Sequence, residues 1–185
     1  MKLTEQQMLV HWRRHRGLVP ERSGCSIEVF DNIDLTARLH LEMRQWYLDL
    51  LDHGDLCHLM LHDVCGRLTL SGGKDGVYRL ALPVDVRRLI SLTIEGAEAT
   101  PVTVATPEKS DARRDILNRN IFSRSGRHRP TAVADEDGRG VTLFCRDGRR
   151  PLVILSAMAV TDPGDETYEM DESALNLLYK HTDYE

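Results

Sequence analysis

Five side chains that can bind a transition metal lie within 13 residues of one another. Histidine nitrogens and cysteine thiolates are the usual ligands of zinc, and a structural zinc site takes four of them in tetrahedral geometry. The spacing here matches no zinc-finger or zinc-ribbon pattern, and no second pair of ligands follows downstream. The five residues are His53, Cys57, His58, His62 and Cys65.

A structural interpretation of the same segment competes with the metal site. Apolar side chains surround Cys57 and His58 between Leu56 and Leu61, as in a buried stretch where cysteine acts as a small hydrophobic residue. His58 and His62 are four residues apart, so one helix can present both. We expect this segment to be buried in the protein and to bind no metal or other cofactor. Zinc remains the alternative, and elemental analysis of the purified protein tests it.

Other familiar catalytic patterns are missing from the sequence. Ser71 to Gly76 is rich in glycine, but it lacks the G-x-x-x-x-G-K-[ST] frame of a phosphate loop and a β-type run follows it. No G-x-S-x-G motif is present, and Cys145 has no base near it in sequence. Carboxylates are abundant, but they occur in turns and in the acidic C-terminal segment. The sequence therefore predicts a protein that is not an enzyme.

The composition is that of a soluble globular protein whose core depends on aliphatic side chains. Of the 185 residues, 41% are hydrophobic, 29% are charged and only 5% are aromatic. The longest apolar runs are too short to cross a bilayer, and the first ten residues show no signal-peptide pattern. The four cysteines follow no disulfide framework, so we expect reduced thiols in a chain made in the cytosol.

Charge is unevenly distributed along a chain whose formal net charge is -5. Residues 113–129 hold six arginines against one aspartate, and residues 162–185 hold eight acidic residues against one lysine. One segment can attract the other, or its counterpart in a neighbouring copy, with two separate solvated surfaces as the alternative. Arginine suits carboxylate pairing at interfaces. The candidate interface residues are Arg113, Arg114, Arg119, Arg124, Arg127 and Arg129.

Helical patterns occur at both ends of the chain. The strongest runs from Asp34 to Asp52, where large apolar residues recur at three- and four-residue intervals. Leu3 to His15 and Asp171 to Lys180 show shorter patterns of the same kind. Pro107 to Asn120 begins with a capping threonine and a proline in the first turn, which predicts a helix inserted among the strands.

Between these helices the pattern changes to alternation with period two. Turns that combine an acidic residue with glycine separate the β-type runs, which is typical of antiparallel hairpins. We therefore predict an α+β fold with N-terminal amphipathic helices, an antiparallel β-rich middle with an inserted helix, and a short C-terminal helix. Residues 1–30 are expected to form an arm or short helix, and residues 31–185 one domain. The predicted β-type runs are Leu68–Leu70, Val77–Leu82, Leu89–Ile94, Val102–Ala105, Thr131–Ala134, Val141–Phe144 and Leu152–Val160.

One segment of the β-rich region resembles a known family. Tyr78 to Leu92 contains Leu82-Pro83-Val84-Asp85, followed by Arg88 and Leu89. It is similar to the x-L-P-x-D-(aromatic)-x-R-L-x-S segment of head–tail connector (adaptor) proteins of tailed bacteriophages. Physically, Pro83 ends a strand because it has no N–H to donate, Asp85 can cap the next turn, and Arg88 can pair with a carboxylate.

The resemblance extends over about residues 30 to 180 in order. Arg119 to Gly126, followed by Arg129-Pro130, is similar to the family's N-x-(aromatic)-x-R-G stretch and its later proline. The segment from Asp34 to Leu51 is similar to the family's leading helix. The sequence departs from the family pattern at Val86, where an aromatic is expected, and at Ala97, where tryptophan is common.

The resemblance implies a structural virion protein, assembled in the host cytoplasm. It would form a homo-oligomeric ring of twelve copies that binds the portal protein and the tail or nozzle proteins, with no membrane contact. The ring would line a channel for genomic DNA, and an acidic lumen would let DNA slide without sticking. Alternatives are another phage structural part, such as a stopper, tail terminator or minor capsid protein; a small nucleic-acid-binding regulator using Arg113 to Arg129; and a zinc-dependent enzyme or sensor.

Overall fold

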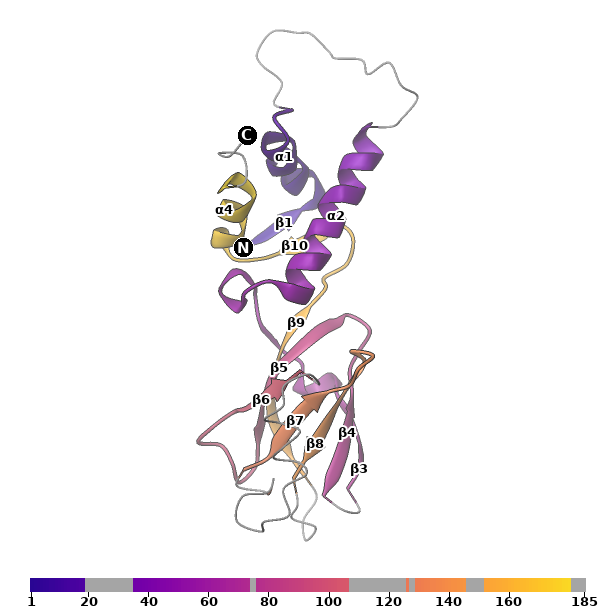
Figure 1. Ribbon diagram of the computed structural model, residues 1–185, viewed down its shortest axis with the longest axis vertical. Helices are drawn as coiled ribbons and strands as arrows, with labels where there is room; N and C mark the ends of the chain where they lie inside the picture. Colours follow the sequence, from indigo (N-terminus) through magenta and orange to yellow (C-terminus); the bar gives the residue numbers. More distant parts are fainter. Residues whose placement is uncertain (19–34, 74–75, 107–125, 127–128, 146–151, 181–185) are drawn as a thin grey trace. The chain divides into compact units, whose positions relative to one another are not determined.

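The computed structural model describes residues 1–18, 35–73, 76–106, 126, 129–145 and 152–180. The chain divides into two compact units (Figure 1). The first unit contains residues 1–60 and 162–185, and the second unit, residues 61–161, is inserted between these two stretches in the sequence. The helices at both ends and the strands in the middle confirm the predicted α+β class. The predicted boundary after residue 30 lies outside the described residues.

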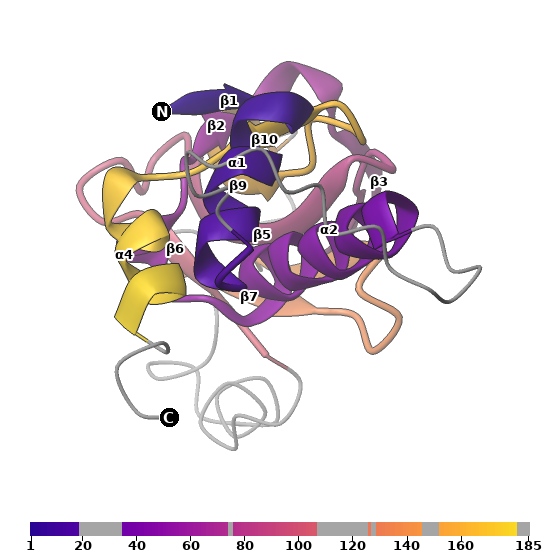
Figure 2. The same ribbon diagram turned by 90° about the horizontal axis from the view of Figure 1, so that it is seen from above.

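The described part of the first unit contains three α-helices and a two-stranded sheet. Strands β1 and β10 pair antiparallel, with Leu3 opposite Tyr168. In Figure 2, α1 lies between α2 and α4. The sequence predicted each helix to within two residues, but it predicted neither short strand. The elements are β1 (Lys2–Thr4), α1 (Glu5–His15), α2 (Leu35–His53), the 3-10 turn η1 (Leu56–His58), β10 (Thr167–Glu169) and α4 (Glu172–Lys180).

Local sequence explains where α1 begins and what it packs against. Thr4 Oγ1 accepts a hydrogen bond from the Gln7 amide, and Gln7 Oε1 accepts one from the Thr4 amide, so the two residues form a capping box. Met8 is fully buried in the core of this unit, and the Trp12 ring lies 5.9 Å from that of Trp46 in α2. Each large side chain buried this way contributes about 2–3 kcal/mol.

The described residues of the second unit form an eight-stranded sheet in the order β2-β9-β5-β6-β7-β8-β4-β3. The predicted antiparallel sheet needs one correction, because β6 and β7 are parallel, with Val104 opposite Ala132. The sheet is therefore mixed, while its other strand pairs are antiparallel. The strands are β2 (His62–Asp63), β3 (Thr69–Gly72), β4 (Val77–Ala81), β5 (Val86–Ile94), β6 (Val102–Ala105), β7 (Thr131–Ala134), β8 (Gly140–Phe144) and β9 (Ile154–Thr161).

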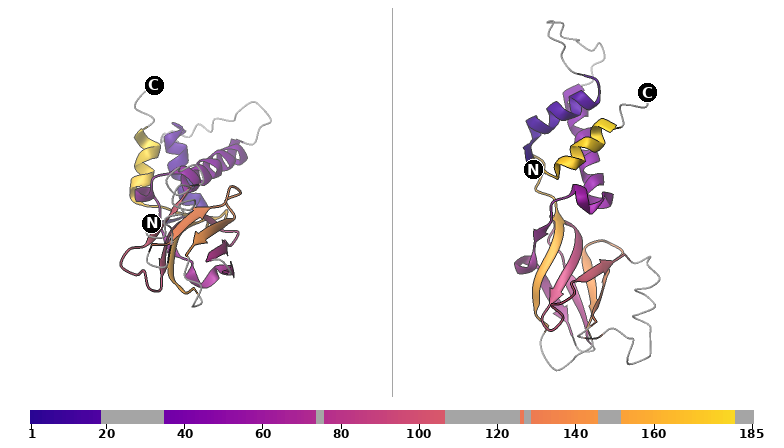
Figure 3. Two further views of the ribbon diagram at one scale, coloured as in Figure 1. Left: turned by 60° about the horizontal axis from the view of Figure 1, so that its bottom comes forward. Right: turned by 90° about the vertical axis from the view of Figure 1, so that its left-hand side faces the viewer.

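The sheet curls into a half-barrel around an aliphatic core, as the right-hand view of Figure 3 shows. Strands β5 and β9 form its longest ladder, and register shifts interrupt that ladder at three places. Such irregularities bend a strand and increase its twist. Leu80, Leu92 and Leu143 are fully buried in the core.

Glycine permits the tight hairpin between β3 and β4. Gly72 and Gly73 have φ angles of 92° and 111°, which side chains with a Cβ rarely adopt. The Gly73 amide donates to the Val77 carbonyl at 2.8 Å. The glycine-rich segment therefore belongs to a hairpin, as the sequence predicted, and not to a phosphate loop at a helix start.

The helix predicted from Pro107 to Asn120 lies outside the described residues. Within the described part of the second unit, the helical element is the 3-10 turn η2 (Cys65–Arg67), and no α-helix interrupts the strands. Among the described helices, none combines the length and the apolar character that a membrane span requires.

Candidate functional site

The metal-binding candidates of the first unit lie where α2 ends. The Gly54 amide donates to the Leu50 carbonyl at 2.8 Å. A Cβ on Gly54 would lie 2.5 Å from that same carbonyl oxygen, so glycine is required at this position. The chain can then turn directly from α2 into η1.

Three potential ligands converge on this turn. Asp55, Cys57 and His58 each offer one ligand atom, and these atoms lie within 4.8 Å of one another. The His58 amide donates to the Asp55 carbonyl at 3.0 Å, which closes the turn and brings the two side chains together. Asp55 precedes η1 without using its carboxylate as a cap. The described residues therefore contain a mixed oxygen, sulfur and nitrogen group, exposed at Asp55 and Cys57.

The start of α4 holds this turn in place. His58 Nδ1 lies 2.7 Å from Ser173 Oγ, and Ser173 Oγ also donates to the Cys57 carbonyl at 3.3 Å. The Asp171 amide donates to the His58 carbonyl at 3.0 Å. Asp171 itself caps α4, and its bonds from the Ser173 amide and hydroxyl lower the pKa of its carboxyl group.

Only part of the predicted zinc set belongs to this group. His53 pairs instead with Asp49, its neighbour one turn earlier in α2, at 3.1 Å. His62 and Cys65 belong to the second unit. The Cys65 thiol donates to the Ile154 carbonyl at 3.1 Å, and burial followed by the Asp63 charge raises the pKa of that thiol. Asp55 is not among the ligands predicted from the sequence, because that set contains only histidine and cysteine.

The segment that resembles connector proteins forms a tight corner in the second unit. Strand β4 ends at Ala81, and the Val86 amide donates to the Pro83 carbonyl at 3.0 Å, closing a four-residue turn. Val84 lies at the apex and is fully exposed. Val86 and Leu89 are buried in the half-barrel, and Leu82 packs against the same core.

An ion pair fixes the second central residue of this turn. Arg67 Nη1 donates to Asp85 Oδ2 at 2.8 Å, joining η2 to the corner. Asp85 was expected to cap the following turn, and the bond that the structure gives it goes to Arg67. Arg88 is half-buried in β5. No local pattern indicates Arg67, because it lies 18 positions before its partner.

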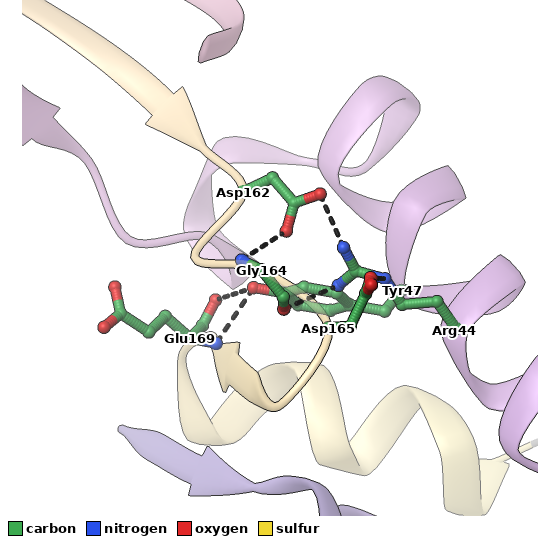
Figure 4. A network of polar contacts seen from close by, with 6 residues as sticks. All are labelled: Arg44, Tyr47, Asp162, Gly164, Asp165 and Glu169. Carbon is green, nitrogen blue, oxygen red and sulfur yellow. Dashed lines mark hydrogen bonds and ion pairs between the residues drawn. The ribbon is translucent and has the colours of Figure 1, made fainter. Parts of the chain in front are cut away.

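Much of the acidic C-terminal segment pairs within the first unit. Arg44 binds Asp162 at 2.6 Å, Asp165 at 3.1 Å and the Gly164 carbonyl at 3.2 Å (Figure 4). Glu169 binds Lys2 at 2.9 Å. These carboxylates are therefore already neutralised within their own chain, which reduces the charge left for a neighbour.

The basic segment lies mostly beyond what the structure describes. Arg113, Arg114, Arg119, Arg124 and Arg127 lie outside the described residues, so their predicted interface role stays a prediction. Arg129 is described and exposed, and its main chain exchanges hydrogen bonds of 3.0 and 3.1 Å with Gly126.

Comparison with known proteins leaves the family open. No protein-family model matches the chain, and no curated protein matches it significantly.

Proposed function

We propose that this chain is a structural subunit of a bacteriophage head–tail connector, forming a homo-oligomeric ring between the portal and the tail. The proposal covers the dodecameric ring, the channel for genomic DNA and the virion location that the sequence resemblance implies. The protein acts by assembly and carries out no reaction. Its partners are copies of itself, the portal protein and tail proteins.

The corner at Val84 is the observation that carries this proposal. Its flanking residues are anchored in the core, the Pro83–Val86 hydrogen bond closes it, and the Arg67–Asp85 pair braces it. It therefore presents a fully exposed apolar side chain on a well-supported turn. Preorganised apolar groups of this kind favour association, because little conformational entropy is lost when they are buried. The corner is also the centre of the sequence resemblance.

A ring needs two different contact surfaces on each subunit. The two units each offer exposed apolar side chains that can supply them. In the first unit, Leu41 on α2 is 70% exposed and Val10 on α1 is 51% exposed. Among the described residues of the second unit, Val84 is the most exposed large apolar residue. In the proposed contact, one subunit contributes the Val84 corner, and its neighbour contributes the exposed side of α2 that carries Leu41.

The net charge fits passage of DNA through the ring. At -5 per chain, a closed ring carries a large negative charge, which repels the phosphate backbone. A channel that does not bind DNA lets it move. Charge-reversed lumen variants that eject DNA at the normal rate would count against this part of the proposal.

Mass photometry of the full-length protein, alone and with the portal protein of the same virus, tests the assembly. We expect a single large closed oligomer, visible as a ring by electron microscopy. Val84→Asp should reduce the oligomer at least tenfold, because association would then bury an unpaired carboxylate. The same variant should keep the melting temperature of the subunit, since the side chain is fully exposed.

Val153→Asp is the matched control, because Val153 is an exposed valine of the same unit outside the corner. This variant should assemble like the unchanged chain. A protein that stays monomeric at all concentrations and ignores the portal contradicts the proposal. Equal assembly of the Val84 and Val153 variants removes the corner from the interface.

A further inference from the structure

We propose that Asp55, Cys57 and His58 form a surface site for a zinc ion. The site is independent of ring assembly, and it differs from the five-residue set that the sequence indicated. It is a three-ligand site at a single 3-10 turn, in which the carboxylate of Asp55 takes the place of His53, His62 and Cys65.

The donor atoms select the class of metal. A thiolate, an imidazole nitrogen and a carboxylate oxygen suit zinc and similar transition metals. Magnesium and calcium instead require oxygen ligands. All three donor atoms lie within 4.8 Å of one another. Rotation of the exposed Asp55 and Cys57 side chains can bring them to the closer spacing that bonds of about 2.0–2.3 Å to one shared ion require. The charges also balance, since a thiolate and a carboxylate neutralise a divalent cation.

Hydrogen bonding at Ser173 selects the useful tautomer of His58. The Ser173 hydroxyl has one proton, and its acceptors are the Cys57 carbonyl and the Asp171 carboxylate. The Ser173 oxygen can then only accept from His58 Nδ1, so Nδ1 carries the ring proton. The other nitrogen, Nε2, is left with a lone pair for the metal. Zinc-bound histidines are held in the same way, by a partner on the second ring nitrogen.

The turn is held in a defined conformation before any ion arrives. Gly54 fixes the exit from α2, and the Asp171 amide bonds to the His58 carbonyl. A β-bridge between Leu59 and Met170 continues the attachment of this segment. Preorganisation of this kind lowers the cost of ordering the ligands on binding.

The solvent exposure of the three ligands determines how an ion can enter the site and which ligand fills its remaining coordination position. Asp55 and Cys57 are exposed and His58 is half-buried, so an ion can enter from solvent without unfolding the unit. Three protein ligands leave the fourth tetrahedral position to water.

Titration of the reduced full-length protein with Zn²⁺, in competition with a chromophoric chelator, measures this binding. We expect one ion per chain. Cobalt added in place of zinc should give the absorption band of a thiolate bound to Co²⁺. Cys57→Ala should abolish that band and weaken Zn²⁺ binding at least tenfold, and its exposed side chain makes it the variant that keeps the fold. Ser173→Ala removes the hydroxyl that positions His58 and the Cys57 carbonyl but removes no ligand, so it should weaken binding about tenfold and leave the cobalt band in place.

Two matched variants decide between this site and its alternatives. His53→Ala and Cys65→Ala change a nearby histidine and a second thiol, and both should bind Zn²⁺ within twofold of the unchanged chain. No cobalt band, or equal binding by the Cys57 variant and the unchanged chain, overturns the proposal. A tenfold loss in the Cys65 variant also overturns it, in favour of the set predicted from the sequence.

Discussion

The hydroxyl of Tyr47 bonds to both main-chain polar groups of Glu169. It donates to the Glu169 carbonyl at 3.0 Å and accepts from the Glu169 amide at 2.9 Å (Figure 4). Tyr47 is completely buried, and its ring lies 4.9 Å from that of Tyr168. A side chain of α2 therefore pairs the outer edge of β10, where no further strand follows in the two-stranded sheet.

Tyr47→Phe should lower the free energy of unfolding by about 1–3 kcal/mol, because it leaves a main-chain donor and acceptor without this partner. Urea denaturation measures the change. Tyr179→Phe is the control, since its hydroxyl bonds the half-buried His11, which can bind water instead. We expect the control to cost less than the Tyr47 change, and equal costs would contradict the special role of Tyr47.

The same hydroxyl should give the protein a defined alkaline sensitivity. Burial, as the largest cause, raises the pKa of Tyr47 from 10.0 to about 12. The neutral form is thus favoured in the folded state, so its contribution is complete below pH 10 and is lost as the pH rises towards 12. The loss should be about 3 kcal/mol. Denaturation between pH 9 and pH 12 should show a smaller decline for Tyr47→Phe than for the unchanged chain, and parallel declines would be inconsistent with this shift.

Arg44→Ala should destabilise the first unit by about 2–3 kcal/mol, because it leaves the largely buried Asp162 carboxylate unpaired. Arg44 also lies over the rings of Tyr47 and Tyr168. The stability of Arg44→Lys should lie between that of Arg44→Ala and that of the unchanged chain. The lysine keeps the positive charge, but its ammonium group cannot form the same fork of hydrogen bonds. Arg38→Ala removes an exposed pair with Glu42 and should cost less than about 0.5 kcal/mol. Thermal unfolding of the three variants provides the ranking.

The Arg67–Asp85 pair should contribute less than about 1 kcal/mol to stability, because both side chains are substantially exposed. A double-mutant cycle with Arg67→Ala and Asp85→Ala measures the coupling. Repeating the cycle in about 1 M salt, where the screening length is about 3 Å, should remove most of the coupling. A salt-independent coupling above 2 kcal/mol would show that the pair is shielded from solvent.

Local patterns predicted the fold well where one segment contains the whole signal. The stripe of apolar residues in α2 and the alternation in β6 and β7 each locate an element without reference to the rest of the chain. The parallel pairing of β6 and β7 was missed, because strand direction depends on a connection and not on the residues in the strands. Strands β1 and β10 were missed because each has three residues, too few for a period to be visible.

The residues of the candidate sites were likewise predictable where they are close in sequence, and they were missed where the tertiary fold brings them together. Cys57 and His58 stand together in the sequence, and so their convergence was predictable. Ser173 completes the arrangement from 115 positions away, and no local pattern reveals it. Arg44 and Arg67 were overlooked for the same reason, since their partners are set by the tertiary fold.

The insertion of the second unit between the two stretches of the first has a consequence for biosynthesis. The β1–β10 pair joins residues 2–4 to residues 167–169, so the first unit cannot be completed until residue 169 has left the ribosome. The half-barrel can fold earlier, and its β2–β9 pair places His62 beside Ala159. Folding of the half-barrel thus shortens the loop that the helical unit must close, which lowers the entropic cost of closing it by about 1 kcal/mol. The folded sheet then holds the two stretches of the first unit close together during synthesis. Mutations that destabilise the sheet should therefore slow the folding of the helical unit.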